Sequence, residues 1–134
     1  MVCIYCGSKT EITNSRDLKR NNSKWRRRRC IDCRQIVTTF EHPDYTNSWL
    51  VSDAESQYKP FLRDRLYLSV YDCLKHRKSA AEEAGSLTDT IISKLASKTS
   101  ASQIDKELLT DIALNCLKHF DSVAAVHYNA YYIK

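Results

Sequence analysis

Four cysteines near the start of the sequence have the type and spacing of metal ligands. Cys3 and Cys6 form one C-x-x-C pair, and Cys30 and Cys33 form a second pair after 23 intervening residues. Two residues between cysteines allow a tight turn to direct both sulfurs at one ion, and two such turns complete a tetrahedron. The spacing predicts a closed, structural site for one Zn²⁺ per chain. A redox-active cysteine pair and an iron–sulfur cluster are alternatives that the spacing favours less.

A run of basic residues ends directly at the second cysteine pair. The arginine fork suits both phosphate oxygens and guanine edges. In an extended segment, successive arginines point to alternating sides, so some can contact phosphates while others reach a groove. The tryptophan in the run either stacks on a base or sugar or packs against the small core. The run predicts contact with DNA, through the candidate residues Arg16, Lys24, Trp25, Arg26, Arg27, Arg28 and Arg29.

The distribution of charge supports a nucleic-acid partner. Residues 1–46 carry ten Lys or Arg against five Asp or Glu, whereas residues 47–134 carry eleven of each. The net charge of +5 therefore lies in the first third of the chain. A dense basic patch on a small module is what a polyphosphate partner requires.

The sequence also predicts the compartment. No run approaches eighteen apolar residues, and the N-terminus lacks the basic start and apolar core of a signal peptide. We therefore expect no membrane partner and a cytoplasmic protein, associated with the nucleoid when it is bound to DNA. In a reducing compartment, cysteines at short spacing bind metal rather than form disulfides.

The elements that must position these residues belong to an α+β fold. Residues 42–48 are rich in turn formers and predict a linker between a domain of residues 1–46 and one of residues 47–134. Strand-like segments cover residues 11–16 and 35–40. A short apolar strand at residues 49–51 is followed by a polar turn and a second strand.

The rest of the chain predicts about four helices. Helical spacing of apolar residues runs from Pro60 to about Arg77, over residues 82–98, and from the capping residue Asp105 onward. A last helix covers residues 122–132, with Val123, Val126 and Ala130 aligned. The expected buried stripe of the third helix consists of Leu109, Ile112, Cys116 and Phe120. Cys73 and Cys116 are expected to be core residues.

Together the motifs closely resemble those of the bacterial ribonucleotide-reductase transcriptional regulators, the NrdR family. The family's order of CxxC, DSR, RRRR, CxxC and FTT[YF]E is matched by Cys3-x-x-Cys6, Asn14-Ser15-Arg16, the arginine run, Cys30-x-x-Cys33 and Thr38-Thr39-Phe40-Glu41. Lys59-Pro60-Phe61 with Arg65-Leu66 resembles the opening of the family's ATP-cone. Residues 117–124 resemble its closing helix, and Tyr132 matches the family's late tyrosine.

The resemblance implies a homo-oligomeric repressor of deoxyribonucleotide-synthesis genes, with a zinc ribbon on operator DNA and a cone that binds ATP or dATP. The residues it implies for the nucleotide are Val51, Lys59, Arg65 and Tyr132. Asp53, however, stands where the family has a phosphate-facing lysine, and Lys59 replaces a glutamate. The second domain is therefore expected either to bind nucleotide in an altered way or to act as a helical oligomerisation domain without it.

Two other classes of function remain as alternatives. The first is a zinc-ribbon adaptor that binds protein or RNA, and salt-dependent, sequence-selective binding to promoter DNA would separate it from a regulator. An enzyme is the least expected class. The four histidines are scattered, and neither an activated nucleophile nor an open metal site emerges from the sequence.

Overall fold

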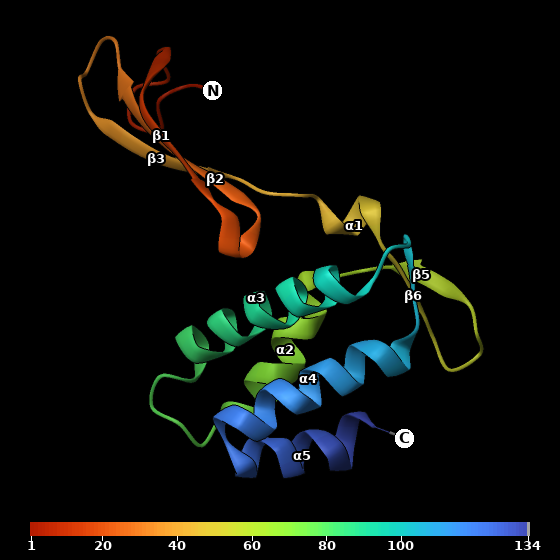
Figure 1. The fold of residues 1–134 in the computed structure, drawn as a ribbon. Coiled ribbons are helices and arrows are strands. Elements are labelled where there is room, and N and C mark those ends of the chain that lie inside the picture. The colour runs from red at the N-terminus through yellow and green to blue at the C-terminus, as the bar shows by residue number, and fades with distance from the viewer. Residues whose placement is uncertain (134) are drawn as a thin grey trace. The chain divides into compact units, whose positions relative to one another are not determined.

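The computed structural model describes residues 1–133 and divides into two compact units, Met1–Pro43 and Asp44–Lys134. The first unit contains an antiparallel sheet in the order β1-β2-β3 (Figure 1). Its strands are β1 (Thr10–Leu18), β2 (Ser23–Cys30) and β3 (Ile36–Glu41), and the 3-10 turn η1 (Lys19–Asn21) joins the first two. The arginine run therefore lies on the central strand, where both of its edges are hydrogen-bonded.

The second unit is mostly helical and carries a small mixed sheet in the order β5-β4-β6. Strand β4 (Leu50–Ser52) pairs antiparallel with β5 (Tyr58–Pro60) and parallel with β6 (Gln103–Ile104). The helices are α1 (Tyr45–Ser48), α2 (Arg63–Leu74), α3 (Ala80–Lys98), α4 (Lys106–Phe120) and α5 (Ser122–Tyr132). This arrangement confirms the α+β class, with an all-β sheet in the first unit and a mostly helical second unit.

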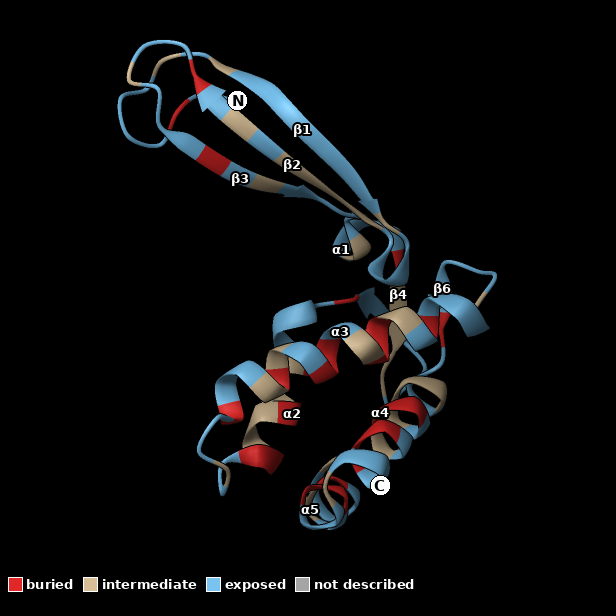
Figure 2. Ribbon diagram, turned by 60° about the vertical axis from the view of Figure 1, so that its left-hand side comes forward, coloured by how far each residue is buried: buried red, intermediate tan, exposed pale blue. Residues whose placement is uncertain are grey.

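The hydrophobic core of the second unit lies between helices α2 to α5. Figure 2 shows their buried residues on the faces that the helices turn toward one another. Cys73 and Cys116 are 2% and 4% exposed, as expected for core residues. The largest side chains that are fully buried here are Leu74, Ile91, Leu95, Ile104 and Leu117. Among the described residues, no helix is both long and apolar enough to cross a bilayer.

Three local expectations were wrong. Pro60 does not start a helix but ends strand β5, and helix α2 begins at Arg63. The proposed linker contains the one-turn helix α1, because the Asp44 carboxylate accepts hydrogen bonds from the backbone N–H groups of Thr46 and Asn47. Phe120 is 41% exposed rather than buried. Its ring lies 4.8 Å from the Arg77 guanidinium, a cation–π contact at the surface.

Helix α5 buries the side opposite to its valines. Ala124, Ala125 and Tyr128 are buried, whereas Val123 and Val126 are 62% and 71% exposed. Small alanine side chains allow the helix to pack closely against α2 and α4, with which it makes its helix contacts. The aligned stripe of Val123 and Val126 is therefore left on the surface.

Candidate metal centre and nucleic-acid interface

Two tight turns in the first unit each present a pair of cysteines. In the first turn, the Cys3 N–H donates to the Ser8 carbonyl at 2.7 Å, and Gly7 has a φ of +77°. Glycine adopts this left-handed conformation at no steric cost. In the second turn, Arg34 takes the matching position with a φ of +63°, and the Cys30 N–H donates to the Gln35 carbonyl at 2.9 Å. The same backbone turn thus follows both C-x-x-C pairs.

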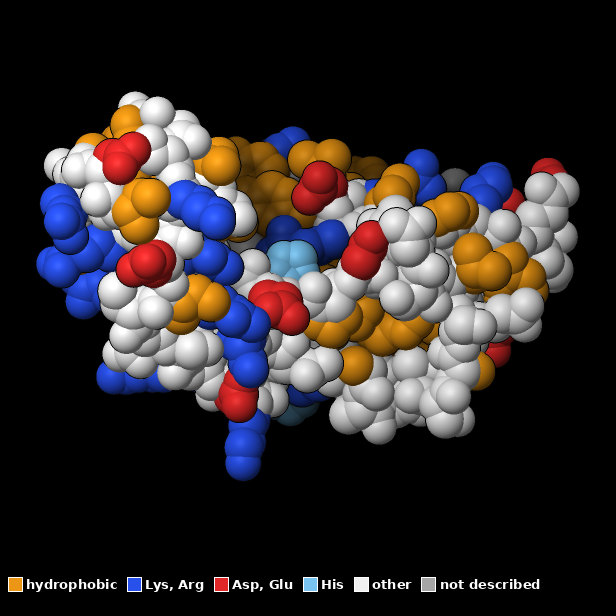
Figure 3. All heavy atoms as spheres, turned by 90° about the horizontal axis from the view of Figure 1, so that it is seen from above, with side chains coloured by type: hydrophobic (Ala, Val, Ile, Leu, Met, Phe, Trp, Pro, Cys, Tyr) orange, Lys and Arg blue, Asp and Glu red, His pale blue; other side chains and the backbone are white. Residues whose placement is uncertain are grey.

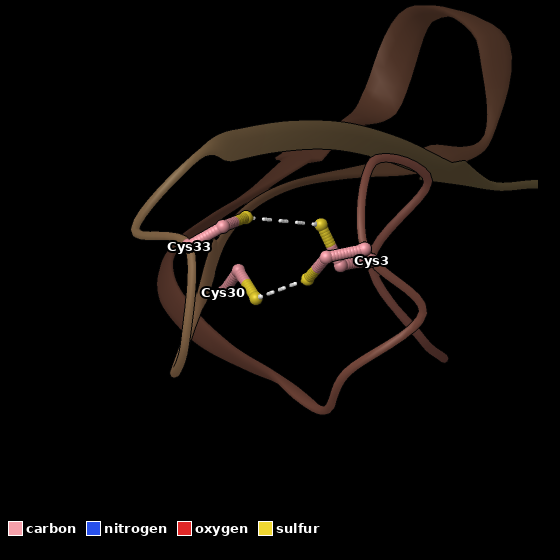
Figure 4. A group of neighbouring side chains, drawn as sticks. Cys3, Cys30 and Cys33 are labelled. Carbon is pink, nitrogen blue, oxygen red and sulfur yellow. Dashed lines mark hydrogen bonds between the residues drawn. The ribbon is translucent and has the colours of Figure 1, made fainter.

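The two turns bring all four predicted ligands into one cluster. Figure 4 shows the labelled side chains of Cys3, Cys30 and Cys33 pointing toward a common centre. The Sγ atoms of Cys3 and Cys33 are 3.7 Å apart, those of Cys6 and Cys30 are 3.4 Å apart, and all four sulfurs lie within 4.8 Å of one another. A tetrahedral zinc ion with Zn–S bonds of about 2.3 Å requires S–S separations of about 3.8 Å. The donor set therefore fits a structural Zn²⁺.

The electrostatics of the cluster also favour a cation. Hydrogen bonds from the backbone N–H and the hydroxyl of Ser8 lower the pKa of Cys6 to about 6. The Gln35 N–H favours the thiolate of Cys33, but desolvation and the neighbouring sulfurs outweigh it and raise the pKa of Cys33 to about 12. Four sulfurs this close can all carry negative charge only when a metal ion neutralises them.

The sheet register sorts the basic run onto two faces. Cross-strand partners in an antiparallel sheet share a face, and successive residues alternate between faces. The face that carries Cys30 also carries Lys24, Arg26 and Arg28, and we call it the cysteine face. The opposite face carries Trp25, Arg27 and Arg29 on β2, flanked by Glu11, Asn14 and Arg16 on β1 and by Ile36, Thr38 and Phe40 on β3, and we call it the open face.

The basic residues of the cysteine face are bonded to neighbouring strands. The Lys24 ammonium lies 3.2 Å from the Asp17 carboxylate, and Arg26 lies 2.9 Å from the Glu41 carboxylate. Arg28 donates through Nε to the Thr39 hydroxyl at 3.3 Å. Two of the three positive charges on this face are therefore offset within the sheet.

The basic residues of the open face are exposed and carry the excess charge. Arg16, Arg27 and Arg29 are exposed, and Glu11, the cross-strand partner of Arg29, is the acidic residue in this set. The Arg16 guanidinium lies 5.8 Å from the centre of the Trp25 ring. Figure 3 shows Lys and Arg side chains gathered around this unit, with hydrophobic side chains between them. The open face thus combines three cations with aromatic rings.

The second unit holds a cavity of about 830 Å³. All four residues that the resemblance implies for a nucleotide line it, namely Val51 on β4, Lys59 on β5, Arg65 on α2 and Tyr132 on α5. Folding thus brings Val51 and Tyr132, which are 81 positions apart in the sequence, to the wall of one cavity. A volume of this order is typical of sites for small molecules.

Asp53 and Lys59, the two charged departures in this region, contact each other. The Asp53 carboxylate lies 2.9 Å from the Lys59 ammonium and also accepts hydrogen bonds from the backbone N–H groups of Glu55 and Gln57. The hydrogen bond from Lys59 and those from the backbone lower the pKa of Asp53. Asp53 therefore stays charged, closes the turn between β4 and β5, and offsets the positive charge of Lys59.

A second pair of opposite charges, Asp72 and Lys75, also lines the cavity. The Asp72 carboxylate accepts hydrogen bonds from Lys75 and, at 3.1 Å, from the Tyr132 hydroxyl. Desolvation and the bond to Asp72 raise the pKa of Tyr132 to about 12. The positive charge of Lys75 is thus also offset by a carboxylate. Arg65 and Lys106 are the lining cations for which the described residues show no ion pair.

Comparisons with known proteins identify relatives of this chain and a family whose model covers the four-cysteine cluster. The sequence model described as "Transcriptional repressor NrdR-like, N-terminal domain" matches residues 1–41. A protein of Azorhizobium caulinodans named Transcriptional repressor NrdR is 32% identical over 98% of this chain and 76% of its own length. Proteins of the same name from Afipia carboxidovorans and Thermomicrobium roseum are 30% and 31% identical over 98% of this chain, and over 83% and 81% of their own lengths. This chain belongs to the NrdR family.

Membership in the NrdR family makes the chain a transcriptional regulator with a zinc-ribbon domain. The predictions from sequence missed one feature of the cavity and one feature of the arginine run in this NrdR family member. Lys106 and Asp72 line the cavity, but Lys106 reaches it only because β6, a strand of two residues, pairs with β4. The second missed feature is the set of partners of the arginines. Their alternation between two faces was expected from the sequence, but their partners depend on the register with β1 and β3.

Proposed function

We propose that this chain is a DNA-binding repressor that acts on promoters of ribonucleotide reductase genes. The observation that carries the proposal is the open face, where Arg16, Arg27 and Arg29 are exposed beside Trp25 on a sheet that ends at the four-cysteine cluster. Family membership supports the regulatory role, since the relatives carry the name of a transcriptional repressor. Such a regulator acts in the cytoplasm, where bacterial DNA lies.

Zinc has a structural role in this proposal. When bound, the ion supplies the cross-link between the turn at Cys3 and Cys6 and the turn at Cys30 and Cys33. The ribbon has little core of its own, because its buried hydrophobic cluster consists of Cys3, Cys30 and Val37 with Cys33 packed against it. Ligation by the four sulfurs therefore supplies much of the energy that orders β2 and its arginines.

The helical unit assembles protomers in this proposal. One ribbon offers a small contact surface, whereas two linked ribbons on paired half-sites multiply the affinity. The exposed stripe of Val123 and Val126 lies on a helix without a charged residue, so a second copy can pack against it without like-charge repulsion. Light scattering tests this role, and an unchanged oligomeric mass in the Val126→Lys variant would exclude α5 as the interface.

The cavity of the helical unit is proposed to bind nucleoside triphosphates weakly. The two acidic side chains Asp53 and Asp72 offset Lys59 and Lys75, which leaves Arg65 and Lys106 to attract a phosphate chain. A triphosphate carries several negative charges, and burial of an anion without matching cations is costly. Regulation by ATP or dATP is therefore altered in this chain.

Binding to promoter DNA tests the main proposal. A duplex from a ribonucleotide reductase promoter and a scrambled duplex of the same length are titrated over a range of salt concentrations. A regulator binds the promoter more tightly, and the logarithm of its affinity falls linearly with the logarithm of the salt concentration. Equal affinity for both duplexes would favour the adaptor alternative, in which the ribbon binds protein or RNA.

A further inference from the structure

A row of flat side chains crosses the open face of the ribbon. Arg16 on β1, Trp25 on β2 and Phe40 on β3 are consecutive cross-strand partners and therefore project from the same face. Phe40 is 59% exposed, Trp25 is half-buried, and the Arg16 guanidinium lies over the Trp25 ring. Neighbouring strands are about 4.8 Å apart, so the three side chains are close neighbours on this face.

Cations lie beside this row on the same face. Arg27 follows two residues after Trp25, and Arg29 follows two residues after Arg27, which places both on the open face within about 14 Å of the tryptophan along the strand. Both arginines are exposed. Their guanidinium groups can bind phosphates of a strand whose bases lie over the rings.

Contact with duplex DNA gives an exposed ring only a limited role, such as apolar contact with a thymine methyl group. In a duplex the flat faces of the bases are covered by their neighbours, and a protein reads base edges and phosphates. Unpaired bases expose their flat faces, which stack on Phe, Tyr, Trp or arginine planes. An exposed Phe40 beside Trp25, on a basic face, matches the combination of rings and cations that binds unpaired bases.

We propose that the open face binds single-stranded nucleic acid by stacking unpaired bases on Trp25 and Phe40, with Arg27 and Arg29 on the phosphates. The proposal rests on the proposed function, because the same face contacts nucleic acid in both. It adds a ligand, the opened strand, that duplex recognition does not include. A regulator with such a face binds promoter DNA in its opened form as well as in its paired form.

The decisive experiment compares ligands that differ only in their bases. Full-length, zinc-loaded protein is titrated, by fluorescence anisotropy at one salt concentration, with an oligo-dT of about twelve nucleotides, a length in the range of single-strand modules. An abasic strand of equal length provides the same phosphates and sugars without bases. We expect oligo-dT to bind at least about tenfold more tightly, since each stacked base contributes about that factor. An oligo-U arm shows whether RNA shares the binding, and base-dependent binding of either strand supports the proposal.

Variants separate stacking from general hydrophobic contact. Phe40→Ala removes an exposed ring and is expected to reduce oligo-dT affinity about tenfold without changing abasic-strand affinity, whereas Phe40→Tyr retains binding. Ile36→Ala is the matched control, because Ile36 is an apolar residue on the same face and is 40% exposed. Zinc content and circular dichroism verify the fold of each variant. An equal loss in the Ile36 variant would overturn the stacking proposal.

Fluorescence of Trp25 supplies a readout that needs no variant of the open face. The chain has two tryptophans, and Trp49 is buried in the other unit, so a Trp49→Phe variant reports on Trp25 alone. Stacked bases of oligo-dT are expected to quench the fluorescence of Trp25, whereas the abasic strand is expected to leave it unchanged. Equal affinity for oligo-dT and abasic strand would assign the rings to packing or to a protein partner and overturn the inference. Promoter duplex binding would then remain, so the failure of the inference is distinct from a failure of the proposed function.

Discussion

At the scale of single residues, the consecutive arginines of β2 have different environments. Arg26 is paired with Glu41 at 2.9 Å, whereas Arg27, the next residue, is exposed on the opposite face beside Asn14 and Thr38. Their charge and side-chain type are identical, so a difference in their effect on DNA binding reports on the faces of the sheet. Neighbouring arginines therefore form a natural matched pair for mutagenesis.

We predict that Arg27→Ala weakens binding to promoter duplex and lowers the magnitude of the salt slope by about one, because one phosphate contact is lost. Arg26→Ala is expected to change the slope by much less, since it removes a charge already offset by Glu41. Salt titrations of both variants against wild-type protein measure the difference. Equal slopes for the two variants would show that the faces do not differ in their contact with DNA.

Asp53, which pairs with Lys59, is the second residue whose ion pair is expected to change ligand binding. We predict that Asp53→Asn raises the affinity for ATP on the order of tenfold, because it removes a negative charge from the cavity wall and frees Lys59. The asparagine keeps a side-chain oxygen for the backbone N–H groups of Glu55 and Gln57. Calorimetry with ATP and dATP measures the change, and Asp89→Asn, outside the cavity, is the control. Unaltered affinity would mean that phosphates do not approach this wall.

At the scale of elements, Asp121 connects three helices. Its carboxylate caps α5 by accepting from the N–H groups of Val123 and Ala124 at 2.9 and 3.1 Å. It also accepts from His76 and Arg77 beyond the end of α2, and Arg77 in turn pairs with Glu83 near the start of α3. Asp121 therefore starts α5, and through Arg77 it links the segment after α2 to the start of α3.

The pKa of Asp121 predicts a loss of stability in acid. Hydrogen bonds from the Ala124 N–H, from His76 and from Arg77 lower the pKa of Asp121 to about 2, below its ordinary value of 3.8. A depressed folded-state pKa stabilises the protein above the unfolded-state pKa, and the contribution is lost as the pH falls from about 4 toward 2.

We predict that Asp121→Ala lowers the free energy of unfolding by about 1–2 kcal/mol at neutral pH, the usual cost of a lost N-cap. Asp121→Asn keeps the cap but should flatten the dependence of stability on pH between about 4 and 2. Urea unfolding followed by helical circular dichroism measures both variants. If the Asn variant retained the full acid-dependent loss, another carboxylate would be its source.

At the scale of the whole molecule, the two units differ in what stabilises them. The helical unit has a contiguous hydrophobic core that includes Leu74, Ile91, Leu95 and Leu117, all with no exposed surface. The ribbon instead depends on the four-cysteine cluster. Small modules without a sufficient core usually need a metal or disulfides.

We therefore predict about one zinc ion per chain and unequal responses to its removal. A strong chelator is expected to unfold residues 1–46 and abolish DNA binding while the helical circular dichroism is retained. Cys33→Ser should act as the chelator does, whereas Tyr5→Ala, at an exposed position within the first turn, should keep the metal. Zinc analysis and amide exchange measure both effects. A fully protected ribbon in the metal-free protein would contradict the prediction.

The sequence by itself determined the local features of this protein. The C-x-x-C spacing predicted the cysteine cluster, and short local patterns predicted β1, β3, β4 and the extent of the helix at residues 122–132. They predicted the arginine run only as an extended segment and did not predict β6. The boundaries at Pro60 and at residues 42–48 were wrong, because a β-strand pairing and an Asp44 cap are decided by partners outside the apolar pattern.

Only the tertiary structure decided which charges are available to a ligand. The sequence shows Asp53 and Lys59 as two departures from a motif, but the β4–β5 hairpin makes them a pair. The run of arginines is uniform in sequence, yet register with β1 and β3 places Arg26 beside Glu41 and leaves Arg27 exposed. The physical reason is that the strength of a charge interaction depends on distance and solvent exposure, which folding sets between residues far apart in the chain.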